Sequence, residues 1–302
     1  MQYRTLGSTG LRVSVIGVGT WQFGGEWGKQ FAVDEVAGML ARARELGINL
    51  LDTAECYGPG HLSESLIGQA LAKLGGRDQW VIASKFGHSF TGFLKRSDER
   101  SVADVKKQLD DSLKALGTHQ IDLYQYHSVR DEEFFNEDLW KFLEDAKRAG
   151  KIRHIGNSIS GNIDPAPQAE GSQKASVEVL QLVYNRLERK PEASAFPIAT
   201  RLNLGVLARV PLASGYLSGK YQPGATFAAG DYRSTQDEAK KDKMLAQAQK
   251  IAREEVPAGV EMAQWALAWC LKNDAVTAVI PGCKNVAQVE GNAKAVEQLK
   301  TA

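Results

Sequence analysis

Few cysteines, no long apolar run and no excess of either charge set the first limits on this sequence. Cys56, Cys270 and Cys283 are too few and too scattered for a disulfide framework or a metal-ligand motif. No apolar run reaches the ~18 residues of a membrane span, and no secretory leader pattern opens the chain. The 37 Lys and Arg residues balance 36 Asp and Glu residues. We therefore expect a reduced, cytoplasmic protein with no nucleic-acid or membrane partner and no metal site.

The glycine patterns of the common nucleotide-binding sheets are also missing. In VIGVGTWQFGG, Gly17 and Gly19 are not followed by a glycine three residues on, as a dinucleotide fingerprint after the first strand requires. SGYLSGK is not a phosphate-binding P-loop, because only three residues separate Gly215 from Gly219 and no Ser or Thr follows Lys220. These absences disfavour an open, doubly wound sheet.

Short apolar runs alternate with longer amphipathic stretches along the chain. The runs are continuous and often β-branched, as expected of strands that are buried on both faces. Strict alternation of strand and helix implies a parallel sheet. Eight such units predict a closed (β/α)8 TIM barrel in a single domain, residues 1–302, with the open doubly wound sheet as the alternative. The predicted strands are 12–19, 48–52, 80–84, 121–126, 152–156, 177–184, 205–210 and 275–280.

Two segments depart from this alternation. The first fifteen residues predict an N-terminal β-hairpin that turns at 8–10 and caps the barrel floor. Residues 212–260 form a long loop between the seventh and eighth strands, including a charged helix over 237–255, and loops of this length are usually functional. Among the regular helices, 101–116 is predicted to begin with a capping box of Ser101 and Asp104 and to end at Gly117.

Ionisable residues end three consecutive predicted strands. Asp52, Lys85 and His127 occupy these positions, and Tyr57 follows Asp52 after five residues. Taken singly, the Asp is a typical helix cap, the Lys a solvated side chain and the His a structural residue, and we interpret Cys56 as a packing residue. Together they can share the active-site end of a barrel.

These four side chains together can support the reduction of a carbonyl group. The ammonium of Lys85, anchored by Asp52, is expected to lower the pKa of Tyr57 from about 10 and to tune the phenol as a proton donor. A neutral His127 can orient a carbonyl oxygen. No side chain delivers hydride, so a nicotinamide cofactor is required.

Successive motifs carry a specific resemblance. DTAECYGPGHLSESLIGQAL, ASK, YQYH, KIRHIGNS, PLASGYLSGKY and IPGCKNVAQVEGN occur in this order. The chain resembles the aldo-keto reductase family over essentially its whole length, and within it the bacterial reductases related to potassium-channel β subunits. The resemblance implies a barrel that binds NADPH without a Rossmann domain. It also implies a catalytic tetrad of Asp52, Tyr57, Lys85 and His127, with Tyr57 as the general acid.

The resemblance also implies where cofactor and substrate bind. Substrate contacts are expected from Trp21, Tyr57, Phe86 and His127. The family commonly has Asn where this chain has Ile159, and often a stacking Tyr where it has Arg209. It often has Arg where this chain has Gln288, so the cofactor's 2′-phosphate is expected to be held less firmly, with Lys284 and Arg233 compensating. The implied cofactor contacts are Gly19, Thr20, Trp21, Asp52, Asn157, Ser158, Gln181, Arg209, Pro211, Leu212, Ser214, Gly215, Lys220, Arg233, Gly282, Lys284, Gln288 and Asn292.

The leading hypothesis is an NADPH-dependent reductase of small aldehydes or ketones. One alternative is a nicotinamide-binding regulatory subunit that senses redox state and turns over slowly. Another is a lyase or aldolase that forms a Schiff base through Lys85. The sequence predicts neither the physiological substrate nor the oligomeric state.

Overall fold

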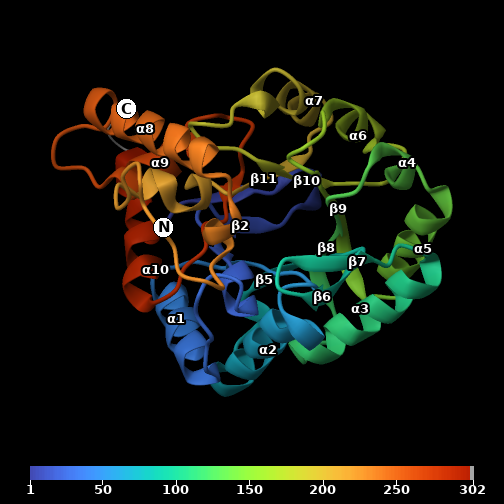
Figure 1. Cartoon of the computed structure of the whole chain (residues 1–302). Coiled ribbons are helices and arrows are strands. Elements are labelled where there is room, and N and C mark those ends of the chain that lie inside the picture. Colours follow the sequence, from blue (N-terminus) through green and yellow to red (C-terminus); the bar gives the residue numbers. More distant parts are fainter. Residues whose placement is uncertain (300–302) are drawn as a thin grey trace.

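Eight parallel strands form one curled sheet in the computed structural model, which describes residues 1–299 (Figure 1). Parallel bridges between Ile16 and Val279 and between Gly19 and Gly282 join the first strand to the last. The predicted (β/α)8 barrel is therefore confirmed, and the open sheet is excluded. In spatial order the strands are β3 (Val18–Gly19), β4 (Leu50–Asp52), β5 (Val81–Phe86), β8 (Ile121–His127), β9 (Ile152–Ser158), β10 (Val179–Val183), β11 (Gly205–Arg209) and β12 (Ala278–Val279).

Helices cover the outside of the barrel (Figure 1). The predicted capping box is confirmed, because the Ser101 hydroxyl accepts a hydrogen bond from the Asp104 amide and the Asp104 carboxylate accepts one from the Ser101 amide. Gly117 ends that helix in the left-handed conformation. The α-helices are α1 (Val33–Glu45), α2 (Leu62–Leu74), α3 (Val102–Leu116), α4 (Asp131–Phe134), α5 (Glu137–Arg148), α6 (Ala166–Gly171), α7 (Ala195–Arg201), α8 (Glu238–Glu254), α9 (Met262–Leu271) and α10 (Val286–Ala293).

Alternation along each strand divides the apolar side chains between two cores. Leu50 and Leu123 belong to the smaller cluster, which fills the barrel interior. Leu51 and Tyr124, one residue further along the same strands, belong to the large cluster shared with the helices. Successive residues of a strand therefore face the barrel axis and the helical layer in turn.

The N-terminal hairpin closes the floor, as predicted. Strands β1 (Tyr3–Thr5) and β2 (Arg12–Ser14) pair antiparallel, so the predicted strand 12–19 is divided between this hairpin and barrel strand β3. Leu6 is completely buried among the interior side chains. Gly7 has a positive φ, and a Cβ there would lie 2.1 Å from the Gly205 amide nitrogen, so the turn needs glycine to approach β11.

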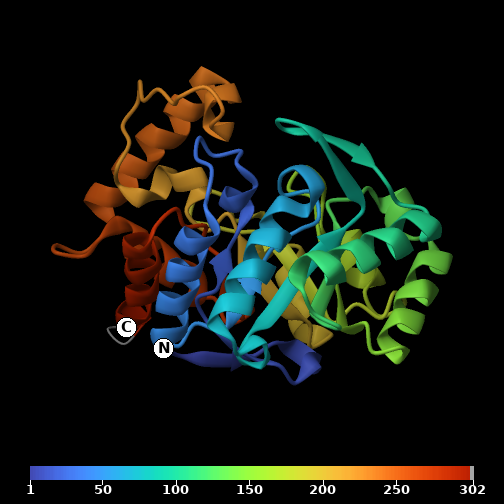
Figure 2. The ribbon, with the colours of Figure 1, turned by 90° about the horizontal axis from the view of Figure 1, so that it is seen from below.

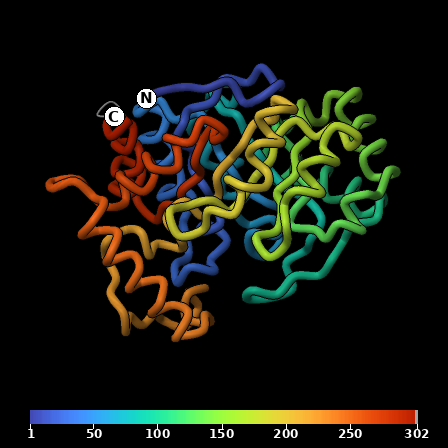
Figure 3. The backbone as a smooth tube through the Cα atoms, turned by 90° about the horizontal axis from the view of Figure 1, so that it is seen from above, coloured from blue at the N-terminus to red at the C-terminus, as the bar shows by residue number. Residues whose placement is uncertain are grey.

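Two further segments rise at the opposite end of the barrel (Figures 2 and 3). One is an antiparallel hairpin, β6 (His88–Gly92) and β7 (Lys95–Asp98), which the sequence did not predict. The other is the predicted long loop, whose helix α8 packs through Leu245 against Tyr216 and Met262 in a small core of its own. Within residues 1–299, no helix combines the length and apolar character needed to cross a membrane.

Candidate active site

The four residues of the predicted tetrad meet at the carboxyl ends of the strands. Lys85 of β5 is completely buried, and its Nζ lies 2.7 Å from Asp52 Oδ1 at the end of β4. The same nitrogen donates to the Thr53 carbonyl at 2.7 Å and lies 3.3 Å from Tyr57 Oη. His127 ends β8, with its ring centroid 6.0 Å from that of Tyr57. The ammonium of Lys85 therefore contacts both the carboxylate of Asp52 and the phenol of Tyr57, and the imidazole of His127 lies beside the phenol.

Burial sets the protonation of the acid and the imidazole. Burial raises the pKa of Tyr57 to about 12, although the charge on Lys85 opposes this change. The expectation that Lys85 would bring the Tyr57 pKa below its ordinary value is therefore wrong. Burial, and then the charge on Lys85, lower the pKa of His127 well below its ordinary value. At neutral pH the site contains a protonated phenol and a neutral imidazole.

A buried polar network holds the carboxylate of Asp52. Its second oxygen accepts from Gln181 Nε2 at 2.6 Å and from Gln125 Nε2 at 3.4 Å. Ser158 Oγ in turn donates to Gln181 Oε1 at 3.3 Å. These side chains come from β8, β9 and β10, so the upper layer of the barrel interior is polar where the lower layers are aliphatic. Asp52 is thereby fixed opposite Lys85.

A cavity of about 440 Å³ opens above this network. Its wall combines strand ends, the segment 210–221, the first turn of α9 and one side of α10. Most of the predicted cofactor contacts line it: Gly19, Thr20, Trp21, Asp52, Gln181, Arg209, Pro211, Leu212, Ser214, Gly215, Lys220, Arg233, Gly282, Lys284, Gln288 and Asn292. Tyr57 lines it too, whereas Lys85, His127 and Ser158 do not form part of its wall.

Sequence reasoning missed several wall residues. Trp27 and Tyr221 stand in loops, where no periodicity marks which aromatic side chain turns inward. The segment GGEWGKQF, with Trp27 and Phe31, is equally compatible with an apolar wall and with loop packing. The other missed residues are Gln22, Val210, Ser218, Glu261, Ala263, Gln264, Ile280, Pro281, Ala287 and Gly291.

Two predicted contacts are corrected by the structure. Phe86 is completely buried in the outer core, where its ring lies 4.9 Å from that of Tyr126. Asn157 is also fully buried, and its Nδ2 donates to Gln168 Oε1 at 2.9 Å. Both residues neighbour inward-facing positions, Lys85 and Ser158, so strand alternation turns them towards the helices.

Four cations surround the cavity. Arg209 Nη2 donates to the Ile159 carbonyl at 3.0 Å, while its buried Nε has no hydrogen-bond partner within residues 1–299. Arg233 is paired with Asp231 through Nη2 and Oδ2 at 2.7 Å. Lys284 Nζ lies 3.6 Å from the same carboxylate and donates to the Trp27 carbonyl at 2.6 Å. Lys220 completes the set. This wall suits a ligand with several phosphates.

Comparison with known proteins gives a consistent result. The model of the Aldo/keto reductase family matches residues 15–302. The chain is 34% identical to the "Uncharacterized oxidoreductase YrpG" of Bacillus subtilis (strain 168), over 98% of this chain and 91% of that protein. It is 30% identical to a "Probable voltage-gated potassium channel subunit beta" of Arabidopsis thaliana, over 98% and 92%. The solved aldo-keto reductase AKR11C1 from Bacillus halodurans (holo form) matches with a TM-score of 0.80 and 31% identity, over 98% and 91%.

Proposed function

The chain belongs to the aldo/keto reductase family, and we propose that it is a cytoplasmic, NADPH-dependent reductase of aldehydes and ketones. The observation that carries this proposal is the position of Tyr57 Oη, which lies 3.3 Å from the ammonium of Lys85 at the base of the cavity. A protonated phenol beside a fixed positive charge is suited to donate a proton to an oxygen that is becoming an alkoxide.

Each member of the tetrad has a distinct role in the proposed reaction. Tyr57 donates its proton to the carbonyl oxygen, and the ammonium of Lys85 stabilises the phenolate that remains. Asp52 keeps that ammonium charged and in place, because the two groups form a buried ion pair. The neutral imidazole of His127 hydrogen-bonds the carbonyl oxygen and directs it towards Tyr57.

The wall of the cavity fits a nicotinamide dinucleotide. Bound there, this cofactor would supply the hydride that no side chain can provide. Gln181 of the wall offers its amide group for the carboxamide, Ser158 supports that side chain by donating to Gln181 Oε1, and Arg209 lines the same wall. Lys220, Arg233 and Lys284 supply positive charge for its phosphates. The extra phosphate of NADPH favours it over NADH at such a wall.

Schiff-base chemistry at Lys85 is disfavoured. Burial alone would lower the pKa of Lys85, but Asp52 and Tyr57 outweigh burial and raise the pKa above its ordinary value. A lysine that stays protonated is a poor nucleophile. The similarity to a potassium-channel β subunit keeps a redox-sensing subunit as the second candidate, because such a protein needs the same cofactor cavity.

A steady-state assay separates these candidates. The purified full-length protein is given NADPH or NADH and a panel of aldehydes and ketones that includes 4-nitrobenzaldehyde, and cofactor oxidation is followed at 340 nm. Cofactor binding is measured in parallel by fluorescence. Turnover of at least one carbonyl, faster with NADPH, is expected. Tight cofactor binding with no turnover of any carbonyl would instead favour the sensing subunit.

A further inference from the structure

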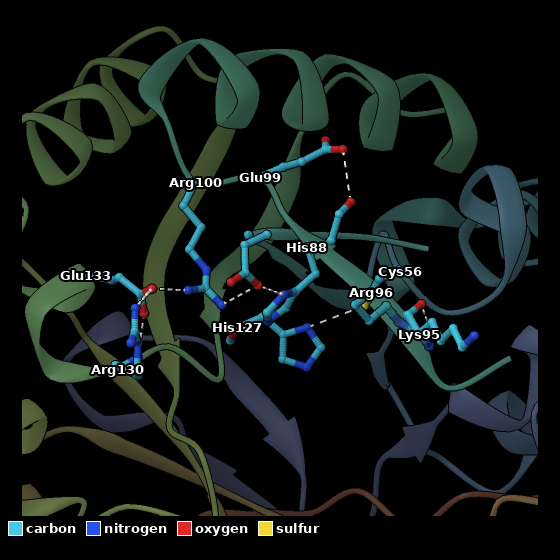
Figure 4. Close-up of polar contacts among 12 residues, drawn as sticks. Cys56, His88, Lys95, Arg96, Glu99, Arg100, His127, Arg130 and Glu133 are labelled. Atoms are coloured by element: carbon cyan, nitrogen blue, oxygen red, sulfur yellow. Dashed lines mark hydrogen bonds and ion pairs between the residues drawn. The ribbon is translucent and has the colours of Figure 1, made fainter. Parts of the chain in front are cut away.

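A second group of reactive side chains lies directly behind His127. Glu55 and Cys56 come from the loop after β4, and each offers an atom within 4.8 Å of the others and of an imidazole nitrogen of His127. His127 Nδ1 lies 3.7 Å from Cys56 Sγ, and Figure 4 shows the imidazole turned towards the sulfur. The proposed proton transfer uses neither Glu55 nor Cys56, so their convergence needs another explanation.

The carboxylate of Glu55 is incompletely satisfied. The side chain is only 4% exposed. One oxygen, Oε1, accepts a hydrogen bond from the His88 amide at 3.0 Å, but Oε2 is buried without a partner among the described residues. Leaving a buried carboxylate oxygen unpaired is costly, and native structures contain few such atoms. A cation between this oxygen, the sulfur and the imidazole would satisfy it.

We propose that Glu55, Cys56 and His127 bind Zn²⁺, with the fourth position open. Tetrahedral ligands at the usual Zn–S and Zn–N distances stand about 3.6 Å apart, close to the observed separation of Sγ and Nδ1. One thiolate, one imidazole and one carboxylate suit zinc better than Mg²⁺ or Ca²⁺, which prefer all-oxygen sites. Three protein ligands leave a coordination position for water.

The surroundings of the site are cationic, because Lys85, His88, Arg209 and Arg96 all act on His127, and the ligands have to offset this charge. Thiolate and carboxylate ligands neutralise the charge of a divalent ion, and the guanidinium of Arg96, which approaches Cys56, is already paired with Glu26. His127 is the partly exposed ligand, and its ring lies beside that of Tyr57, which lines the cavity. None of the three ligands lines the cavity itself, so the partly exposed His127 provides the nearest approach for an ion.

Zinc at this position fixes the hydrogen-bonding state of His127. Because the ion occupies Nδ1, the hydrogen of the neutral imidazole stays on Nε2, where it can be donated to the carbonyl oxygen. This positioning role rests on the proposed reductase function, whereas metal binding itself does not.

Cobalt provides a test that does not depend on turnover. Chelator-washed full-length protein is titrated with Co²⁺, and absorbance and calorimetry are recorded. One ion per chain is expected, with a thiolate-to-cobalt charge-transfer band in the near ultraviolet. The band is lost in Cys56→Ala, and binding is weakened in Glu55→Gln. The matched variant Cys270→Ala alters an equally buried thiol elsewhere, and it keeps both signals. Circular dichroism verifies that each variant is folded.

The possible outcomes are distinct. A wild-type protein without the band, or a band that persists in Cys56→Ala, overturns the metal site. Unchanged affinity in Glu55→Gln removes Glu55 from the ligand set. Zn²⁺ at the concentration that fills the site is expected to lower the KM for carbonyl substrates in the wild type, and to have no such effect on Cys56→Ala. A filled site with an unchanged KM overturns the positioning role. If the cobalt charge-transfer band is present but no carbonyl is turned over, the reductase proposal is overturned and the metal site is supported.

Discussion

At the scale of single residues, the buried ion pair between Lys85 and Asp52 joins stability to chemistry. Both side chains lie almost out of contact with solvent, and Lys85 makes its other hydrogen bonds to Thr53 and Tyr57. Removing one partner of a buried pair leaves the other charge unpaired, which typically costs about 3–5 kcal/mol. Replacing both by neutral groups avoids that penalty.

We therefore predict that Lys85→Met lowers the free energy of unfolding by about 3–5 kcal/mol. The double variant Asp52→Asn/Lys85→Met should recover much of this loss, as urea unfolding will show. Lys73→Met provides the control, because Lys73 pairs with Asp34 at the surface and should change stability far less. A Lys85→Met protein as stable as the wild type would show that the pair is not buried in solution.

A second residue-scale prediction concerns Gln288. Its Oε1 accepts from the Lys284 amide at 2.8 Å, and both residues line the cavity. Gln288→Arg adds a cation beside Lys284, and a charge-assisted hydrogen bond to phosphate of about 1.4 kcal/mol would improve the preference for NADPH over NADH about tenfold. Dissociation constants from cofactor fluorescence measure this ratio.

The matched control adds the same charge at the other end of the molecule. Gln173 is exposed at the floor of the barrel, so Gln173→Arg should leave the cofactor ratio unchanged. Equal effects of the two variants would mean that overall charge, rather than a contact at 288, sets the preference.

At the scale of elements, Glu26 ties the β6–β7 hairpin to the mouth of the cavity. Its buried carboxylate accepts from the Leu94 amide at 2.7 Å and from Trp21 Nε1 at 2.8 Å, and it pairs with Arg96. One side chain therefore joins the hairpin to a tryptophan of the wall. The hairpin contributes few buried apolar side chains, so its position depends on these polar contacts.

We predict that Glu26→Gln loosens the hairpin. Amide hydrogen exchange at Leu94 should become at least tenfold faster, and KM for carbonyl substrates should rise while the dissociation constant for NADPH stays the same. Glu137→Gln, which alters an exposed ion pair with Lys174, is the control. Unchanged exchange at Leu94 would show that the position of the hairpin does not depend on the charge of Glu26.

The same hairpin shows where sequence reasoning stops. The barrel strands were predictable because each is an apolar run between turns, and Asp52, Lys85 and His127 were predictable because polar residues end such runs. His88–Gly92 and Lys95–Asp98 are short, polar and partly exposed, so neither periodicity nor apolar content marks them.

Other errors came from side-chain direction. Phe86 lies next to Lys85 in sequence, but strand alternation sends the two to opposite faces of the sheet. The pKa of Tyr57 depends on the depth of burial as well as on Lys85, and depth is a property of the folded barrel. Residue type and position were therefore readable from the sequence, whereas orientation and burial required the structure.

At the scale of the whole molecule, the side chains that close the barrel floor and those that line the cavity lie at opposite ends of the barrel. The N-terminal hairpin closes the floor (Figure 2). Leu6 is fully buried there, and the cavity is lined by strand ends and loops at the other end of the barrel. We predict that Leu6→Ala lowers the free energy of unfolding by about 2–5 kcal/mol, because it leaves a void in the core. KM values for cofactor and substrate should not change.

The exposed substitution Lys107→Ala on α3 is the control, with an expected change within about 0.5 kcal/mol. Urea unfolding and steady-state kinetics are measured on both variants. A large rise in the KM for NADPH in Leu6→Ala would show that the floor and the cavity are coupled, against the separation argued here.

The central claim is that Tyr57 is the proton donor of a carbonyl reductase. The most direct measurement compares wild type with Tyr57→Phe, following NADPH oxidation with 4-nitrobenzaldehyde and NADPH binding on the same preparations. Loss of a general acid predicts a fall in kcat of about 10²- to 10⁴-fold with little change in NADPH affinity. A Tyr57→Phe protein that retains wild-type kcat would contradict the account.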